Sequence, residues 1–425
     1  MRIVNIGLLI DGTGAPAARQ QALIIEGSCI AWLGPQDQMP PPPAGHDSTP
    51  LDAGGATALP GLIDAHVHLQ SPSAGSDPPD DAQSLFSHKF FDPAGITVLR
   101  MARNAQLALA AGITTLRDCG SRDGLARQVR DAIDQGLLVG PRILAAGQVI
   151  TTTAGHCYLM GHEADSADEM RKAIRSEVKA GSDFIKVMAT GGFGTPGSSP
   201  KKPQYSAAEL RAAVEDAHRL GKRVAAHVYG PEGIRNCVEA GVDSLEHCSW
   251  LTEEDVSYGT GYDAGVVAEM AARGLYVAAA FGIGERAKRQ RARTRGEAAL
   301  QRYLYERSAH CQSFRQMLAA GVSLCVGTDA GSGINWRIDA IATNLADFVE
   351  LLGLSPLAAL QTLTRNPAQM MGLGDRVGTL EAGKEADLIL VDGDPLRDPR
   401  ALERVRLVVR AGRLVARYGQ VLPLP

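Results

Sequence analysis

Hydrophobic and polar residues alternate with the period of a β-strand near both ends of the chain. The first such stretches are RIVNIGLLID and ALIIEGSCIAWLG, which lie within residues 1–58. The last are GTLEAGKEADLILVD and RVRLVVRAGRLV, which lie within residues 373–425. This alternation is typical of half-buried strands. We therefore expect residues 1–58 and 373–425 to form one small β-sandwich domain assembled from both ends of the chain.

The middle of the chain, residues 59–372, follows a different pattern. Short apolar runs recur there, among them GITTLRD, DFIKVMA, KRVAAHV and GVSLCVGTD. Amphipathic stretches such as SAAELRAAVEDAHRLG separate them, and a closing glycine is typical of a helix C-cap. This repeated strand–helix alternation predicts an α/β protein with a (β/α)8 TIM barrel, although a doubly wound sheet would give the same pattern. The polar residues decide between the two.

Composition and charge exclude several classes of function. Hydrophobic residues make up 45% of the 425 residues and charged residues 21%, as in ordinary globular proteins. The formal net charge of −4 is too small to favour a nucleic-acid or membrane partner. No stretch has the length of a membrane span or the pattern of a secretory signal. The seven cysteines are scattered without C-x-x-C spacing, so we expect a reduced, cytoplasmic protein.

Polar side chains occur at or near the ends of several apolar runs, where a barrel carries its catalytic groups. They are His66, His68, Lys186, His227, His247 and Asp329. His66 and His68 are two residues apart, so on an extended strand both rings face the same side, as two ligands of one metal must. An isolated H-x-H pair is weak evidence. The complete set carries the argument for a metal site in a barrel.

The other members of this set also have structural interpretations. His227 and His247 are compatible with ordinary hydrogen-bonded histidines, and Asp329 with an N-cap of the turn that follows it. Lys186 is different, because a lysine inside an apolar strand is costly to bury as a cation. It could pair with a carboxylate or extend to the surface. Carbamylation by carbon dioxide would instead convert its amine into an anion that can bridge two cations.

Several motifs together resemble the amidohydrolase superfamily over nearly the whole chain. They are PGLIDAHVH after an N-terminal β segment, a lysine on the fourth strand, two later histidines, an aspartate on the eighth strand, and NPAQMMGLGDRVGTLEAGKEADLILVDGDP near the C-terminus. KVMATGG, AHVYG and TTTAGHCY are similar to the branch of imidazolonepropionase-like proteins and metal-dependent Xaa-Pro dipeptidases. Imidazolonepropionase lacks the strand-four lysine and uses one metal, so Lys186 favours the two-metal, dipeptidase-like side.

The resemblance implies a site for two divalent metal ions. Zinc suits a shell of nitrogen and oxygen ligands, although Co²⁺ or Mn²⁺ could substitute. Two such ions can share a hydroxide by lowering the pKa of water to about 7. The implied ligands are His66, His68 and Asp329 for the more buried ion, His227 and His247 for the second, and carbamylated Lys186 as the bridge.

The resemblance also implies three catalytic residues. Asp329 would accept the proton of the hydroxide and pass it to the leaving amine, a role that requires a carboxylate beside the metals. His156 and Tyr229 would donate hydrogen bonds to the developing oxyanion. For Tyr229, a place in the pocket wall is the structural alternative. We expect cleavage of a peptide-like amide bond, with Xaa-Pro dipeptides or N-acyl amino acids as the first substrates to test.

Less can be predicted about the rest of the substrate site. Residues 190–206, TGGFGTPGSSPKKPQYS, are rich in glycine and proline and suggest a lid over the site. Lys201, Lys202 and Arg337 are candidates for binding a carboxylate of a small-molecule substrate. Arg337 is the better candidate, because it closely follows Asp329 in the sequence.

Alternative functions stay open at this point. Cyclic amides of the imidazolone type, carbamates and lactones are other possible substrates within the superfamily. Single-metal deaminases fit less well, because Lys186 is expected in two-metal hydrolases. A non-catalytic binding or scaffold barrel should show gaps in the ligand set, and we find none. Family resemblance also implies association into a homo-oligomer.

Overall fold

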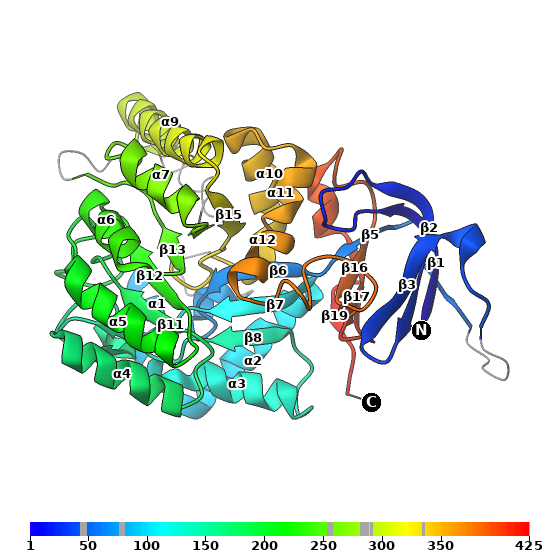
Figure 1. Ribbon diagram of the computed structural model, residues 1–425, viewed down its shortest axis with the longest axis horizontal. Coiled ribbons are helices and arrows are strands. Elements are labelled where there is room, and N and C mark those ends of the chain that lie inside the picture. The colour runs from blue at the N-terminus through cyan, green and yellow to red at the C-terminus, as the bar shows by residue number, and fades with distance from the viewer. Residues whose placement is uncertain are drawn as a thin grey trace.

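Strands from the two ends of the chain lie together at one side of the molecule, beside a larger body formed by the middle of the chain (Figure 1). The structure is a computed structural model, and it describes residues 1–42, 49–75, 81–252, 258–280, 289, 292–333 and 336–424. The larger body contains parallel strands with helices around them. A barrel with a small β domain made from both termini is the fold expected from the sequence, and this expectation is confirmed.

The terminal strands join in one nine-stranded sheet. Its order is β19-β18-β17-β16-β5-β1-β2-β3, and β4 pairs with β1. The C-terminal strands join the N-terminal strands through the antiparallel pairing of β16 with β5. The bounds are β1 Arg2–Leu9, β2 Ala18–Glu26, β3 Cys29–Pro35, β4 Leu51–Asp52, β5 Thr57–Pro60, β16 Leu388–Val391, β17 Val405–Arg410, β18 Arg413–Arg417 and β19 Gln420–Val421.

The strands of the barrel are parallel and mostly buried. They pair in the orders β6-β7-β8 and β10-β9-β11-β12-β13-β14-β15. A parallel bridge between Val67 and Ala330 brings the segment after β15 against the end of β6, which closes the ring. The bounds are β6 Leu62–Val67, β7 Ile113–Asp118, β8 Arg142–Ala145, β9 Val149–Thr151, β10 Gly161–Glu163, β11 Ile185–Met188, β12 Val224–Val228, β13 Ser244–His247, β14 Tyr276–Ala279 and β15 Ser323–Val326.

Helices cover the outside of the barrel (Figure 1). Local sequence fixes where several begin: Ser206 and Glu209 form a capping box at the start of α5, and Ser166 caps α4. None of the helices in the described ranges combines the length and the apolar sequence that a bilayer span requires. The bounds are α1 Ala82–Phe91, α2 Ala94–Ala110, α3 Leu125–Asp134, α4 Ala167–Lys179, α5 Ala207–Arg219, α6 Pro231–Ala240, α7 Ala264–Ala272, α9 Glu297–Ala319, α10 Ile341–Leu352, α11 Pro356–Gln361 and α12 Arg365–Met370.

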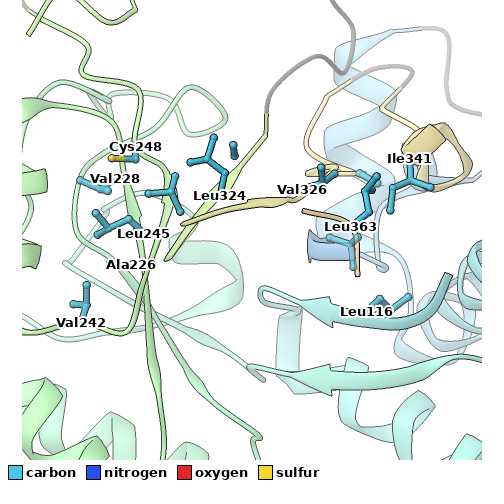
Figure 2. Close-up of a cluster of buried hydrophobic side chains, with 14 of the residues drawn as sticks. Leu116, Ala226, Val228, Val242, Leu245, Cys248, Leu324, Val326, Ile341 and Leu363 are labelled. Atoms are coloured by element: carbon cyan, nitrogen blue, oxygen red, sulfur yellow. The ribbon is translucent and has the colours of Figure 1, made fainter. Parts of the chain in front are cut away.

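Alternation along the barrel strands separates an apolar layer from the polar residues. Ala226 and Val228 of β12 and Leu245 of β13 belong to one large buried hydrophobic cluster (Figure 2). Successive side chains of a strand point to opposite faces, so His227 and Glu246 face away from that cluster. The pattern that builds the apolar layer thus places polar groups on the other face of the same strands.

Arg142, at the start of β8, joins the barrel to the terminal sheet. Its guanidinium donates to Asp387 Oδ2 at 2.8 Å and to Glu385 Oε2 at 2.5 Å, both just before β16. It also donates to Thr115 Oγ1 of β7 at 2.7 Å. The Asp387 side chain is only 2% exposed. A buried carboxylate of this kind depends on its paired cation, because water cannot reach it to take the place of that cation.

We predict that Arg142→Met lowers the free energy of unfolding by about 3 kcal/mol, because Asp387 would stay buried without its cation. Urea unfolding followed by circular dichroism measures the loss. Arg171→Met is the matched control, because Arg171 pairs with Asp168, whose side chain is 91% exposed. Exposed pairs contribute less than about 1 kcal/mol. Equal losses in the two variants would contradict the role assigned to Arg142.

Candidate metal centre

His66, His68 and Asp329 meet at the end of β6. The Nε2 atoms of His66 and His68 each lie 3.6 Å from Oδ1 of Asp329. All three residues are buried, and their ligand atoms form a group that could hold a metal ion. Nitrogen and oxygen atoms bound to one tetrahedral zinc at about 2.0–2.1 Å are roughly 3.3 Å apart. The observed spacing is therefore close to what a shared ion requires.

His227 and His247 form a second group on the neighbouring strands β12 and β13. His227 pairs with Glu246 and Val228 with His247 in the parallel register, so the two histidines lie one position apart on adjacent strands. Nδ1 of His227 lies 3.1 Å from Nε2 of His247, again close to the spacing of two ligands on one ion. The other ring nitrogen of His227, Nε2, donates to Gly191 O at 3.2 Å. This bond leaves the Nδ1 lone pair directed toward His247.

The backbone is left-handed at one candidate ligand in each group. His247 has a φ of 66° and Asp329 a φ of 50°, values that non-glycine residues seldom adopt. Glu246 contacts His66 while the next residue, His247, contacts His227, so two consecutive residues reach the barrel interior. A regular strand would send them to opposite faces. The strained turn at His247 thus allows both side chains to serve the site.

Lys186 brings a buried amine to the same region. It lies on β11 beside β12, two residues before Met188, which pairs with His227. The residue is 1% exposed, and its Nζ has no hydrogen-bond partner within the described residues. An unpaired buried ammonium is costly, and such a group should be neutralised or paired. A carbamate at this position would be an anion that two cations could satisfy, so the residue fits the bridging role expected from the sequence.

Most of these histidines are held in the neutral form. Burial is the main cause that lowers the pKa of His68, His227 and His247 well below the ordinary value. Neighbouring titratable groups add to this effect: Lys89 for His68, His156 for His227, and His66 for His247. Neutral imidazoles keep a lone pair, which is the form that binds a metal.

A buried chain of polar contacts fixes the orientation of His66. Its Nδ1 donates to Glu246 Oε2 at 2.7 Å, and Glu246 Oε1 accepts from Arg117 at 2.6 Å and from Ser244 Oγ at 3.0 Å. Burial raises the pKa of Glu246, but Arg117 and Lys186 outweigh burial and hold it well below its ordinary value. The ionised carboxylate accepts the Nδ1 proton of His66 and fixes the ring with Nε2 facing Asp329. Burial lowers the pKa of His66, but Cys119 and Glu246 outweigh burial and raise it to about 9, so a metal ion that binds at Nε2 must displace a proton.

Two further buried carboxyl groups hold the strand ends that carry the ligands. Asp64 Oδ2 accepts from Thr328 Oγ1 at 2.6 Å, which positions the residue before Asp329. Asp118 Oδ2 accepts from the backbone N–H of Leu69, beside His68, at 2.9 Å. Burial raises the pKa of Asp64 to about 6 and that of Asp118 to about 7. No sequence motif pointed to these two residues or to Glu246, although an acidic residue in a buried strand was an available signal.

His156 lies against the second histidine group. Its ring centroid is 4.5 Å from that of His227, and burial, followed by the charges of Lys89 and Lys186, lowers its pKa to about 3. Thr195 Oγ1 accepts from the N–H of Cys157 at 2.9 Å, so its own hydroxyl can donate to His156 Nδ1 at 3.1 Å. The resulting tautomer carries its proton on Nε2, which lies 3.4 Å from Cys157 Sγ, a weak acceptor that a substrate oxygen could displace.

Tyr229 completes the set of residues expected at the site. Its ring stacks on that of His247, with centroids 4.6 Å apart and an interplanar angle of 8°. Burial, followed by the charge of Asp329, raises the pKa of its hydroxyl well above the ordinary value, so the hydroxyl stays protonated. Within the described residues, that hydroxyl has no hydrogen-bond partner. It is therefore available to donate to a substrate.

The loop of residues 190–206 packs over this part of the site. Besides the Thr195 contact, Gln204 Oε1 accepts from the N–H of His156 at 2.7 Å. A Cβ atom at Gly192 would lie 2.4 Å from the His156 ring, so only glycine lets the loop approach so closely. The loop expected to act as a lid therefore positions His156 directly.

A cavity of about 90 Å³ opens beside Tyr229 and His247. Of the cations suggested from the sequence, Arg337 donates to Asp339 Oδ1 at 2.8 Å, and Lys202 is exposed. A further cation, Arg307 of α9, lines the cavity itself. The remaining lining residues are largely aromatic or polar: Ser249, Tyr258, Ala280, Tyr303, Glu306, His310 and Trp336.

Known proteins of similar sequence and structure identify the family. The amidohydrolase family matches residues 57–415. Ochratoxinase of Aspergillus niger is 29% identical over 432 residues, covering 96% of this chain and 84% of that protein. Imidazolonepropionase of Cutibacterium acnes is 27% identical over 411 residues, covering 91% and 89%. A Xaa-Pro dipeptidase crystallised with methionine in its active site has a TM-score of 0.79 at 28% identity, covering 97% of this chain and 98% of that one. The chain is similar to imidazolonepropionases and Xaa-Pro dipeptidases; it belongs to the amidohydrolase family and is a hydrolase that acts on amide bonds.

Proposed function

We propose that this hydrolase uses two divalent metal ions, zinc in the first instance, to cleave N-acyl amino acids or dipeptides. The proposal rests on one observation: two groups of possible metal ligands lie near a buried amine that has no hydrogen-bond partner among the described residues. Atoms of each group are 3.1–3.6 Å apart, and the buried Nζ of Lys186 lacks any hydrogen-bond partner among the described residues. The proposed ligands are His66, His68 and Asp329 for one ion, His227 and His247 for the other, and carbamylated Lys186 between them.

The side chains around the site have distinct tasks in this proposal. When bound, the two ions supply the Lewis acidity that activates water and polarises the substrate carbonyl. Asp329 takes a proton from the attacking water and transfers it to the nitrogen of the leaving amine. His156 Nε2–H and the Tyr229 hydroxyl donate to the carbonyl oxygen as negative charge develops on it. Glu246 acts indirectly, by holding the ring of His66.

The choice of substrate class rests on the relatives and on the cavity. The relatives include an ochratoxinase and a Xaa-Pro dipeptidase. The cavity beside Tyr229 is lined by Tyr258, Tyr303 and Trp336, whose rings suit an apolar or aromatic group on the substrate. Cyclic amides, carbamates and lactones form the second class to test. From the sequence alone, we also propose that the protein is cytoplasmic and forms a homo-oligomer.

Turnover of a matched substrate panel tests the proposal. We expect the zinc-loaded enzyme to hydrolyse either Xaa-Pro dipeptides or N-acyl amino acids, because both place an amide beside an α-carboxylate. Chelation should abolish turnover, and added Zn²⁺ should restore it, because the ions activate the attacking water. Product amines are measured by chromatography. Turnover of cyclic amides, carbamates or lactones alone would contradict the substrate class.

Removing the proposed bridge should change the metal content. We predict that Lys186→Ala binds no more than one ion per chain where the wild type binds two, and that its kcat falls by about 10³-fold or more as water activation is lost. Elemental analysis of the dialysed proteins measures the content. Lys172→Ala, which alters an exposed lysine on α4, is the control and should keep both ions. Two ions and full activity in Lys186→Ala would refute the bridging role.

The contact from Glu246 to His66 gives a separate test. We predict that Glu246→Gln weakens binding of the tightest zinc ion about 10- to 100-fold, because the ring of His66 loses its ionised partner. Competition with a chromophoric chelator measures the affinity. Glu177→Gln is the matched control, since Glu177 is also buried and pairs with Arg127 at 2.5 Å, outside the proposed ligand set. Both variants should lose stability, but only Glu246→Gln should lose zinc affinity. Equal zinc affinities in the two variants would exclude the positioning role.

A further inference from the structure

Helix α1 brings a cation to the metal centre that no sequence motif indicated. Lys89 Nζ donates to the carbonyl oxygen of Gly331 at 3.2 Å. Gly331 follows Asp329 by two residues and packs against His68, since a Cβ atom there would lie 2.4 Å from His68 O. The amine of Lys89 therefore sits beside the turn that carries Asp329 and packs against His68. It is also one of the charges that depress the pKa of His156, after burial.

Lys89 has no anionic partner at this position. Within the described residues, its only hydrogen bond goes to a neutral carbonyl group, and no carboxylate lies within ion-pairing distance. The other cations near the site are arranged differently: Arg117 is paired with Glu246, and Arg337 with Asp339. Lys89 is half-buried, and burial is the main cause that lowers its pKa. An ammonium group that has lost contact with water and has free N–H donors is strongly stabilised by an anion that binds beside it.

The position of Lys89 relative to Asp329 indicates which anion it would meet. In the proposed reaction, Asp329 delivers a proton to the nitrogen of the leaving amine. When the leaving group is an α-amino acid, only the α-carbon separates that nitrogen from a carboxylate. The carboxylate must then lie close to Asp329, on whose turn Lys89 is anchored. A lactone, a carbamate of a simple amine or a cyclic amide without an α-carboxylate would gain nothing from Lys89.

We propose that Lys89 binds the α-carboxylate of the leaving amino acid and thereby restricts the enzyme to N-acyl α-amino acids and dipeptides. The inference rests on the proposed function and deepens it by assigning a residue to substrate selection. Lys89 replaces Lys201, Lys202 and Arg337 as the carboxylate-binding residue. Its ammonium can keep the bond to Gly331 O and use its remaining donors for the carboxylate, which makes the contact charge-assisted.

The test compares substrates that differ only in charge. N-acetyl-L-phenylalanine and glycyl-L-proline are each assayed against their carboxamides with wild type, Lys89→Met and Lys89→Arg. We expect Lys89→Met to lose roughly 10- to 100-fold in kcat/KM on the acids, mainly through KM, because one charge-assisted contact is lost. The carboxamides should be unaffected, and Lys89→Arg should retain most of the preference for acids. Equal losses on acids and carboxamides would show that Lys89 is only structural and would overturn the proposal.

Arg307 provides the competing assignment, because it lines the cavity beside Tyr229. If Arg307→Met loses activity selectively on the acids and Lys89→Met does not, the carboxylate lies in the cavity and the proposal fails. If both variants lose activity on the acids, the assignment of Lys89 stands and Arg307 adds to it.

A binding measurement separates this inference from the proposed function. Calorimetric titration of the zinc-loaded proteins with L-phenylalanine and L-proline, and with their amides, requires no turnover. Tighter binding of the acids to wild type, lost in Lys89→Met at unchanged zinc content, supports Lys89 even if no tested substrate is hydrolysed. In that case the proposed function would be wrong, but the assignment of Lys89 would stand. Equal binding of acids and amides to the wild type would overturn the assignment of Lys89 even if hydrolysis is observed.

Discussion

The burial of the Lys186 amine without a partner is the constraint on which the rest of the site depends. A buried ammonium without hydrogen bonds is costly even with the charge of Glu246 nearby, and in the described part of the chain nothing hydrogen-bonds to the Nζ of Lys186. The surrounding imidazoles and carboxylate are arranged as ligands for metal cations that would bind after the protein has folded. The neutral imidazoles of His227 and His247 face one another with ring nitrogens 3.1 Å apart, a spacing at which they can share a hydrogen bond or bind one cation together.

The ligand atoms converge because the backbone departs from regular strand geometry at two positions. Left-handed φ values at His247 and Asp329 turn these residues toward the site, at a cost of roughly 1–3 kcal/mol each. Buried carboxylates offset that cost through hydrogen bonds to the same strand ends, as Asp64 does at Thr328 and Glu246 does at His66. The interactions that stabilise the barrel ends are therefore also the ones that orient the proposed ligands.

The sequence predicted the parts of this site that follow from strand periodicity. Alternation indicated the barrel, the two-residue spacing placed His66 and His68 on one side, and a lysine in an apolar run marked Lys186. Periodicity could not reveal that Glu246 and His247 both reach the interior, because this depends on a left-handed residue. Lys89 was missed for another reason: it lies on a helix whose amphipathic pattern is weak, and only the fold brings it near Asp329.

Crystallography of the zinc-soaked protein, with anomalous scattering recorded at the zinc edge, tests the central claim most directly. The account predicts two zinc peaks, one among His66 Nε2, His68 Nε2 and Asp329, and one between His227 Nδ1 and His247 Nε2. It also predicts electron density for a carbamate on Lys186 that contacts both ions. A single peak beside an unmodified Lys186, or zinc bound at other residues, would contradict it.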